Sequence, residues 1–460
     1  MRAVLRATTL VTLGLLSLVF FSARVEGALP QDYSFTFAAG GDHGDSTRFR
    51  LSLDSLNQSG ASFYLALGDL AYSSVEQAWC QQWLTGSGNP SGKSFKNILL
   101  LAGNHDSGED PSGNINLYTQ YCGLEPLAPS DFTSSPNQTA PQNGCEWPDA
   151  TRRCYGKEYY FDWPISNPIA RFIMISPQID YKVDNGERWV YDTQTGRARY
   201  DFASNAIDSA RALGITWIIV GTHKVHLESD ASHSSGMGAE IFNLLVEKKV
   251  DLLLQGHVHN YERTSQLAHS TTCPAIDLTY NATCVANQGS RFYKDQGTIV
   301  AITGSFGRSL TTIASEPDTP YFQSLNDTTW GFTKISLSRL RLDAQFVATS
   351  GGAFTDNFTI LATDTYGFQF DWADYNNDGR VDILDVAQAA EYFDEICVSL
   401  VATPRQCYWD LDIDGMVSVV DIARIATLFD IIQLTPYLGQ GRDEYNLDPI
   451  FAGTMNGPPG

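Results

Sequence analysis

Seven side chains of metal-binding type stand in five short blocks, and each block follows an apolar run typical of a buried strand. The blocks are Gly41–Gly44, Gly68–Tyr72, Gly103–Asp106, Val220–His223 and Gly256–His259. The candidate ligands are Asp42, Asp69, Tyr72, Asn104, His223, His257 and His259. One block alone is a weak signal, but all five in this order supply enough donors for two adjacent metal ions.

The types of donor restrict the metals. Asp and His are hard and borderline ligands that suit iron, zinc or manganese, and the carboxylate of Asp69 is the natural bridge between two ions. A phenol loses its proton only at about pH 10. As a ligand at lower pH, Tyr72 therefore requires a strongly Lewis-acidic ion, which favours Fe(III) beside a divalent ion of iron, zinc or manganese. The alternative for Tyr72 is an ordinary tyrosine at the edge of the core.

Short apolar runs bounded by glycine or turn residues predict the strands that carry these blocks. They are Tyr33–Gly40, Ser62–Leu67, Ile98–Ala102, Arg171–Ser176, Thr216–Val220 and Val250–Leu254, and later Thr298–Thr303, Thr333–Leu337, Leu340–Val347 and Asn357–Leu361. Helix-length segments are Ser46–Leu56, Ala203–Leu213 and Met237–Lys249. The pattern predicts an α/β (α+β) fold, a two-sheet β-sandwich flanked by helices, with the blocks at one sheet edge.

From about Tyr33 to Leu361 the chain resembles the purple acid phosphatases, of the tartrate-resistant acid phosphatase type, in all five blocks and in the run Gly256–Arg263, which reads GHVHNYER. The resemblance implies a metallophosphoesterase fold and an acid phosphatase acting on phosphomonoesters. It assigns Fe(III) to Asp42, Asp69, Tyr72 and His259, and the second ion to Asp69, Asn104, His223 and His257. Other members of the superfamily often have His where this chain has Gly44, and here Tyr72 takes over that role.

The resemblance also implies a mechanism. A hydroxide held between the ions attacks phosphorus in line, and two histidines bind phosphate and protonate the leaving alcohol. His105 and His233 are the candidates; His233 is chosen by its spacing of ten residues (233 − 223) from a ligand, and His226 is a rival. His43 is interpreted as a filler of the first block. Alternative functions are a phosphodiesterase or phytase on the same site, or a scaffold-bound interaction protein with an inert site.

A repeat with a period of 36 residues (410 − 374) follows this region. Each copy places oxygen-bearing side chains along a loop like that of an EF-hand, with Gly at the sixth position. The candidate calcium ligands are Asp374, Asn376, Asp378, Asp382, Asp385, Asp410, Asp412, Asp414, Ser418 and Asp421. The repeat resembles a dockerin, which implies calcium-dependent folding and a cohesin-like partner. A calcium-stabilised tail without a partner is the alternative.

Four segments are expected: a signal peptide (1–27), the binuclear metallophosphoesterase domain (28–363), the dockerin-like repeat (364–435) and a tail (436–460). Arg2 and Arg6 precede an apolar run too short to span a bilayer. A signal anchor is the alternative, and no membrane span is expected after signal removal. The expected location is extracellular or in the endolysosomal lumen.

Cysteines, sequons and charge support a secretory protein without a nucleic-acid partner. Eight cysteines fit an oxidising compartment, and their spacing suggests the pairs Cys145–Cys154, Cys273–Cys284 and Cys397–Cys407, leaving Cys80 with Cys122. Free thiols are the alternative. Glycosylation is predicted at Asn57, Asn137, Asn281, Asn326 and Asn357. The net charge of −22 opposes binding to a phosphate backbone.

Overall fold

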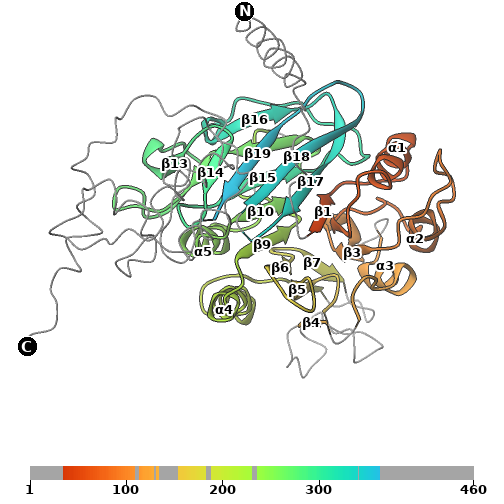
Figure 1. The fold of residues 1–460 in the computed structure, drawn as a ribbon, viewed down its shortest axis with the longest axis horizontal. Coiled ribbons are helices and arrows are strands. Elements are labelled where there is room, and N and C mark those ends of the chain that lie inside the picture. The colour runs from red at the N-terminus through yellow and green to blue at the C-terminus, as the bar shows by residue number, and fades with distance from the viewer. Residues whose placement is uncertain are drawn as a thin grey trace, which may run out of the picture. The chain divides into compact units, whose positions relative to one another are not determined.

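The computed structural model describes residues 35–108, 113–128, 131–133, 154–182, 188–230, 236–339 and 341–362. The predicted signal peptide, the dockerin-like repeat with all its calcium ligands, His233 and Asn137 lie outside the described residues. Within them, two large sheets of seven and eight strands form the framework (Figure 1). The prediction of a mixed α/β fold with two large sheets is confirmed.

The seven-stranded sheet runs in the order β14-β19-β18-β17-β1-β2-β3. Its strands are β14 (Arg291–Tyr293), β19 (Asn357–Leu361), β18 (Arg341–Ser350), β17 (Trp330–Leu337), β1 (Phe35–Gly40), β2 (Tyr64–Leu67) and β3 (Ile98–Leu101). β1, β2 and β3 are parallel, whereas β17 pairs antiparallel with β1 and β18. The carboxyl ends of β1, β2 and β3 therefore meet at one edge.

The eight-stranded sheet runs in the order β16-β11-β15-β10-β9-β6-β5-β4. Its strands are β16 (Phe322–Asn326), β11 (Tyr261–Thr264), β15 (Ile299–Thr303), β10 (Leu252–Gln255), β9 (Trp217–Thr222), β6 (Ala170–Ile175), β5 (Glu158–Trp163) and β4 (Phe132–Thr133). The central strands β6, β9, β10 and β15 are parallel. Two small ribbons pair β7 (Asp180–Lys182) with β8 (Arg188–Val190), and β12 (Gln266–Leu267) with β13 (Val285–Asn287).

Aromatic side chains fill the space between the large sheets. The ring of Phe37 on β1 meets the ring of Phe172 on β6 edge to face, with centroids 4.9 Å apart. Phe63, just before β2, contacts both rings at 5.4 and 5.2 Å. All three are fully buried, so the sheets bury a large apolar area against each other.

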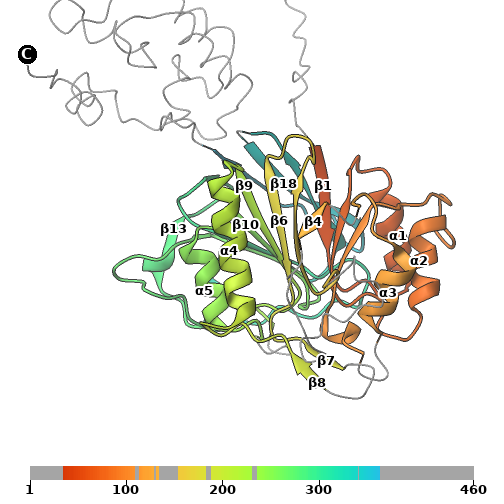
Figure 2. The same ribbon diagram turned by 90° about the horizontal axis from the view of Figure 1, so that it is seen from below.

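Helices cover the outer faces of the sheets. They are α1 (Thr47–Leu56), α2 (Glu76–Thr85), α3 (Ile115–Cys122), α4 (Ala198–Ala212) and α5 (Ala239–Glu247). Figure 2 shows α1, α2 and α3 on one side of the layers and α4 and α5 on the other. The helix α1 begins after Ser46, whose hydroxyl accepts from the Phe49 N–H, and it buries Phe49, Leu53 and Leu56.

All ten predicted strands have counterparts in the structure, with shifts of up to three residues at their ends. Among the predicted helices, α1 and α5 lie where expected, whereas α4 begins at Ala198, five residues before the predicted start. The helices α2 and α3 were not predicted. Their buried faces carry Trp79, Trp83 and Tyr118. Aromatic residues have a lower helix propensity than Ala or Leu, so they give little local indication of a helix.

Two predicted disulfides are present: Cys80–Cys122, which joins α2 to α3, and Cys273–Cys284. Cys154 is also disulfide-bonded. Among the predicted glycosylation sites, Asn357 is exposed, but Asn326 is buried and its Nδ2 donates to the Thr329 carbonyl at 3.0 Å. We therefore expect Asn326 to stay unmodified in the folded chain.

No helix in the described part of the chain is long and apolar enough to cross a membrane.

Candidate metal centre

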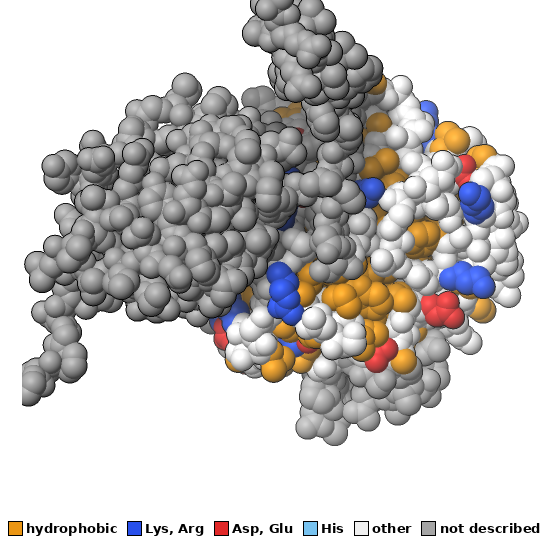
Figure 3. Space-filling model, in the orientation of Figure 1, with side chains coloured by type: hydrophobic (Ala, Val, Ile, Leu, Met, Phe, Trp, Pro, Cys, Tyr) orange, Lys and Arg blue, Asp and Glu red, His pale blue; other side chains and the backbone are white. Residues whose placement is uncertain are grey.

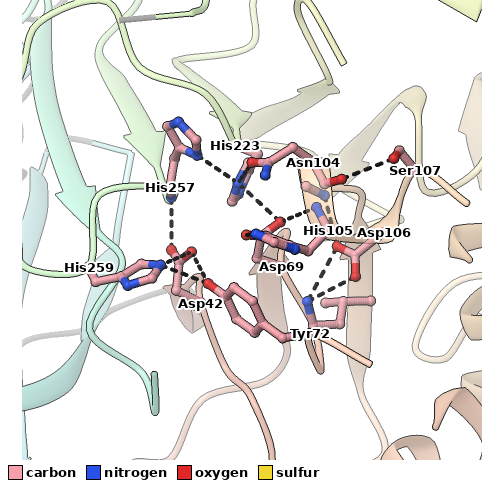
Figure 4. Close-up of polar contacts among 12 residues, drawn as sticks. Asp42, Asp69, Tyr72, Asn104, His105, Asp106, Ser107, His223, His257 and His259 are labelled. Atoms are coloured by element: carbon pink, nitrogen blue, oxygen red, sulfur yellow. Dashed lines mark hydrogen bonds and ion pairs between the residues drawn. The ribbon is translucent and has the colours of Figure 1, made fainter. Parts of the chain in front are cut away.

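The five blocks all lie at carboxyl ends of parallel strands. Asp42 follows β1, Asp69 follows β2 and Asn104 follows β3. From the other sheet, His223 follows β9 directly and His257 follows β10 by two residues. Because the two sheets pack face to face, these ends meet and the side chains of all seven predicted ligands come together (Figure 4).

The local backbone at this edge is unusual. Asp42, Asp69, Tyr72 and His257 have φ of 60°, 52°, 61° and 73°, the left-handed region that side chains other than glycine seldom adopt. They make up half of the eight such non-glycine residues in the described part of the chain. Strained backbone of this kind persists where the surrounding structure enforces it, and it gathers at functional sites.

Glycine at position 103 is required by close approach. A Cβ there would lie 2.0 Å from Asp69 Oδ1 and 2.4 Å from the Asp69 backbone nitrogen. The two loops that carry Asp69 and Asn104 can therefore touch only because Gly103 has no side chain.

One group of donors joins Asp42, Tyr72 and His259. The Tyr72 hydroxyl donates to Asp42 Oδ1 at 2.7 Å and lies 2.8 Å from His259 Nε2. His259 Nε2 is 3.4 Å from Asp42 Oδ1. Asp42 is fully buried, Tyr72 and His259 partly so. We call these three residues the phenol group.

A second group joins Asn104, His223 and His257. His223 Nε2 lies 3.1 Å from Asn104 Oδ1 and 3.2 Å from His257 Nδ1. His223 Nδ1 lies 2.8 Å from the Leu67 carbonyl, a contact that fixes the ring orientation and leaves Nε2 for the site. We call these three residues the imidazole group.

Asp69 lies between the two groups. Its Oδ1 is 3.3 Å from His223 Nε2, and one ligand atom each from Asp42, Asp69 and His223 lies within 4.8 Å of the other two. A buried cluster of two carboxylates and an imidazole fits a metal ion. The whole donor set, with oxygen and nitrogen atoms turned toward one another, fits two ions that share Asp69.

Ionisation in the metal-free chain reflects the same crowding. Burial disfavours the charged form of Asp42, but the hydrogen bond and charge of His259 outweigh it and hold the pKa of that carboxyl well below its usual value. Burial, and then the charges of Asp42 and Asp69, raise the pKa of Tyr72 well above 10. This phenol can therefore ionise only with a cation beside it. A bound metal ion would be such a cation.

His105 lies at the open side of the site. Its side chain is 44% exposed, and its Nε2 is 3.9 Å from Asp69 Oδ2. Its backbone N–H donates to Asp69 Oδ1 at 2.8 Å, and its ring centroid lies 4.7 Å from that of Tyr72. His105 can therefore reach a substrate that contacts the two groups.

The other histidines have different surroundings. His43 is fully buried, its Nε2 lies 2.9 Å from the Tyr64 hydroxyl, and its ring packs 4.8 Å from Phe306, so it is part of an aromatic cluster. Burial lowers its pKa to about 3, so it stays neutral. His226 is buried against Phe242, and its Nε2 lies 3.3 Å from the Ile276 carbonyl. It makes no contact with the two groups among the described residues.

Asp106 was missed from the sequence although it ends the third block. It is fully buried, and it accepts from the Leu70 N–H at 3.0 Å and the Gly103 N–H at 2.8 Å. These bonds tie the loop after β2 to the loop after β3 and so position Asp69 and Asn104. Its place in the same block as Asn104 and His105 was the available signal.

Residues 41–261 match the model of the calcineurin-like phosphoesterase family. The chain therefore carries a calcineurin-like metallophosphoesterase domain, and the five blocks all begin within the matched range. Its relatives include purple acid phosphatases at low identity.

One relative is "Probable inactive purple acid phosphatase 27" of Arabidopsis thaliana, 28% identical over 278 residues, 54% of this chain and 41% of the relative. A "Nucleotide pyrophosphatase/phosphodiesterase" of Hordeum vulgare is 27% identical over 39% of this chain and 50% of its own length. Among solved structures, the purple acid phosphatase PPD1 of yellow lupin (Lupinus luteus) seeds aligns over 71% of this chain and 54% of its own, with 18% identity and a TM-score of 0.49. The chain spans half or less of the two curated relatives.

Proposed function

We propose that the domain is a binuclear acid phosphatase that hydrolyses phosphomonoesters. The observation that carries this proposal is the convergence of the phenol group and the imidazole group on Asp69. The metallophosphoesterase family and the purple acid phosphatase relatives support the same reaction class. Two ions held there would supply Lewis-acid polarisation of the phosphate and activation of a water.

In this proposal Asp42, Tyr72 and His259 hold Fe(III), Asn104, His223 and His257 hold a divalent ion of iron, zinc or manganese, and Asp69 is shared by both ions. The proposal for Fe(III) is supported by the place of Tyr72, whose hydroxyl faces a carboxylate and an imidazole at hydrogen-bond distance. Binding a metal there displaces the phenol proton, so we expect metal loading to release protons.

The chain's own residues then handle the substrate. His105, exposed and beside Asp69, binds a phosphate oxygen and donates a proton to the leaving alcohol. His233 is proposed as its companion from its spacing in the sequence. The disulfides Cys80–Cys122 and Cys273–Cys284 support an oxidising, extracellular or endolysosomal location. The calcium-binding repeat and its cohesin-like partner remain proposals from the sequence.

The test is hydrolysis of p-nitrophenyl phosphate between pH 4 and 8, with metal analysis and a visible spectrum of the purified protein. Wild type should hold two ions per chain, absorb by phenolate-to-iron charge transfer, and turn over at acid pH. His105→Gln should keep both ions and the colour but lose about 10²-fold or more in kcat. Full metal content without hydrolysis of any phosphoester would overturn the proposed function.

A phosphodiesterase is the second candidate, because the barley relative carries that name. Rates on bis-(p-nitrophenyl) phosphate distinguish a phosphodiesterase from a phosphomonoesterase. A phosphomonoesterase should hydrolyse this diester far more slowly than the monoester. An interaction protein with an inert site is a further alternative, and the Arabidopsis relative is itself named "Probable inactive purple acid phosphatase 27". The donor set argues against an inert site here, because the side chains of all seven candidate ligands lie together (Figure 4).

A further inference from the structure

The loop Gly304–Thr311, which follows β15, is fastened to the phenol group by its backbone. The N–H groups of Gly307 and Arg308 donate to the Asp42 carbonyl at 3.2 and 2.8 Å. His259 Nδ1 lies 3.1 Å from the Ser309 carbonyl, and the Thr311 N–H donates to the His259 carbonyl at 3.0 Å. The position of this loop is therefore fixed relative to the ligands.

This loop places the side chain of Arg308 beside the site. The guanidinium carbon lies 4.2 Å from the centroid of the Tyr72 ring, a distance at which a cation is attracted to the ring face. The same ring contacts His105, the residue proposed to meet the substrate. Arg308 itself is exposed, whereas Asp42 and Asp69 are buried.

The guanidinium of Arg308 has no acidic partner in the described part of the chain. Other arginines near the core are paired: Arg171 with Asp162, Arg199 with Glu158, and Arg263 with Asp356. In a chain of net charge −22 an unpaired cation at the rim of a phosphate site is notable. On the face drawn in Figure 3, the described Lys and Arg side chains stand apart from one another rather than in a patch.

We propose that Arg308 is a specificity-determining residue that binds a second phosphate of the substrate. The inference rests on the proposed function, because it assumes that the scissile phosphoryl group lies on the buried metal ligands. The exposed guanidinium then faces the group attached to that phosphoryl group. A planar fork of five N–H donors matches phosphate oxygens in pairs, so the favoured substrate class is a phosphoanhydride.

The reaction needs no further reactant. Water adds across the P–O–P bond, its oxygen joins the attacked phosphorus, and the bridging oxygen leaves with the second phosphate. A proton of the water goes to the leaving phosphate, and Arg308 would bind the non-bridging oxygens of that phosphate, which an alcohol or a phenol lacks.

The experiment compares kcat/KM for inorganic pyrophosphate and for p-nitrophenyl phosphate in wild type, Arg308→Gln and Arg48→Gln. Arg48 is a matched control, because it is exposed and stacked 3.8 Å over the Trp330 ring, and it contacts none of the seven candidate ligands in the described structure. Arg308→Gln should lower the value for pyrophosphate by about 10- to 100-fold, as expected for a lost charge-assisted hydrogen bond, and leave p-nitrophenyl phosphate within about threefold. Arg48→Gln should leave both within about threefold, and metal content should be equal in all three proteins.

Equal losses on both substrates, or the same loss in Arg48→Gln, would overturn the role of Arg308. Calorimetric binding of methylenediphosphonate and of inorganic phosphate to the metal-loaded proteins decides the matter without turnover. Arg308→Gln should weaken binding of the diphosphonate by about 10-fold or more and leave the affinity for phosphate unchanged. Unchanged binding of the diphosphonate would refute the inference. Because binding is measured separately, an inactive wild type would count against the proposed function alone.

Discussion

The two large sheets contribute different atoms to the candidate metal centre. The seven-stranded sheet supplies oxygen only, from Asp42, Asp69, Tyr72 and Asn104, which follow β1, β2 and β3. The eight-stranded sheet supplies nitrogen only, from His223, His257 and His259, which follow β9 and β10. Each donor group combines both kinds, so neither sheet can hold either proposed ion alone.

With metal bound, this division would make the candidate metal centre a cross-link between the sheets. Without metal, its contacts across the interface are short: Tyr72 to His259 at 2.8 Å and Asp69 to His223 at 3.3 Å. The aromatic layer of Phe37, Phe63 and Phe172 joins the same sheets by apolar burial. The apolar layer holds the sheets together, and we expect metal bound at the candidate centre to fix how their edges meet.

The largest effect should come from Asp69, the one oxygen donor that serves both groups. Asp69→Asn should lose both ions and more than about 10³-fold in hydrolysis of p-nitrophenyl phosphate, since the Lewis-acid stabilisation of several kcal/mol disappears. Metal analysis and initial rates measure this. Asp208→Asn, at an exposed carboxyl paired with Lys248, is the control and should match wild type. Retention of both ions by Asp69→Asn would show that Asp69 is not shared.

Next, single changes on opposite sheets should remove different ions. Tyr72→Phe should bleach the visible band and weaken iron retention, because the phenolate is lost. His223→Ala should deplete the divalent ion and abolish turnover while the colour persists. Visible spectra and metal analysis of both variants separate these outcomes. Loss of both ions in both variants would mean that the two groups do not bind separately.

Chelation should then loosen the interface between the sheets. One ion present at a hundred times its Kd stabilises the folded state by about 2.7 kcal/mol, so removing both should lower the Tm by at least about 5 °C. Differential scanning calorimetry with and without a strong chelator tests this. Asp69→Asn should show no such shift. An equal Tm in wild type before and after demetallation would mean that the apolar layer alone sets the stability.

The smallest effect concerns a carboxyl of the nitrogen-donating sheet that is not a ligand. Burial raises the pKa of Glu262, on β11, to about 8, against hydrogen bonds from Asn260 and Ser229. Between about pH 4.5 and 8 the folded chain therefore keeps a proton on Glu262 that the unfolded chain releases. The stability linked to this proton is fully present below pH 4.5 and is lost as the pH rises toward 8. Glu262→Gln should therefore flatten the fall of Tm between pH 5 and 8.

The same scan on Glu247→Gln, at an exposed carboxyl, should follow wild type. The variant Glu262→Gln keeps its hydrogen bonds, so it should fold. Its side-chain oxygen can still accept from the Ser229 N–H. Its side-chain NH2 can donate to Asn260 Oδ1, which has no hydrogen-bond partner among the described residues. An unchanged pH profile in Glu262→Gln would show that this carboxyl is ionised in the folded state throughout the range.

Much of the framework could be predicted from the sequence because it is encoded locally. Buried parallel strands such as Ile98–Leu101 are continuous apolar runs, and a ligand at the end of each run needs only the general rule for such sheets. The seven candidate donors could therefore be named without knowledge of which strands pair. The helix α2 was not predicted, because its helix propensity is weak. It forms because tertiary packing of Trp79 and Trp83 outweighs that weak propensity.

The residues that support the ligands could not be predicted in the same way. Arg308 lies 236 residues from Tyr72 in sequence (308 − 72), and only the pairing of β15 beside β10 brings its loop to the site. The contact between His223 and the Leu67 carbonyl likewise depends on how the two sheets face each other. Such contacts are non-local, and no periodicity in the sequence records them.

The left-handed backbone at four of the candidate ligands lowers the stability of the folded chain at the place where metal is proposed to bind. Each such residue raises the free energy of the folded chain by roughly 1–3 kcal/mol, less for Asp42, Asp69 and His257 than for the bulkier Tyr72. Glycine adopts these angles without strain, so glycine at Tyr72 or His257 would relax the apo chain while removing a ligand. A laboratory selection for heat resistance that withheld metal and ignored activity should therefore erode this site early, whereas bound metal, which stabilises the folded chain, favours keeping the four side chains.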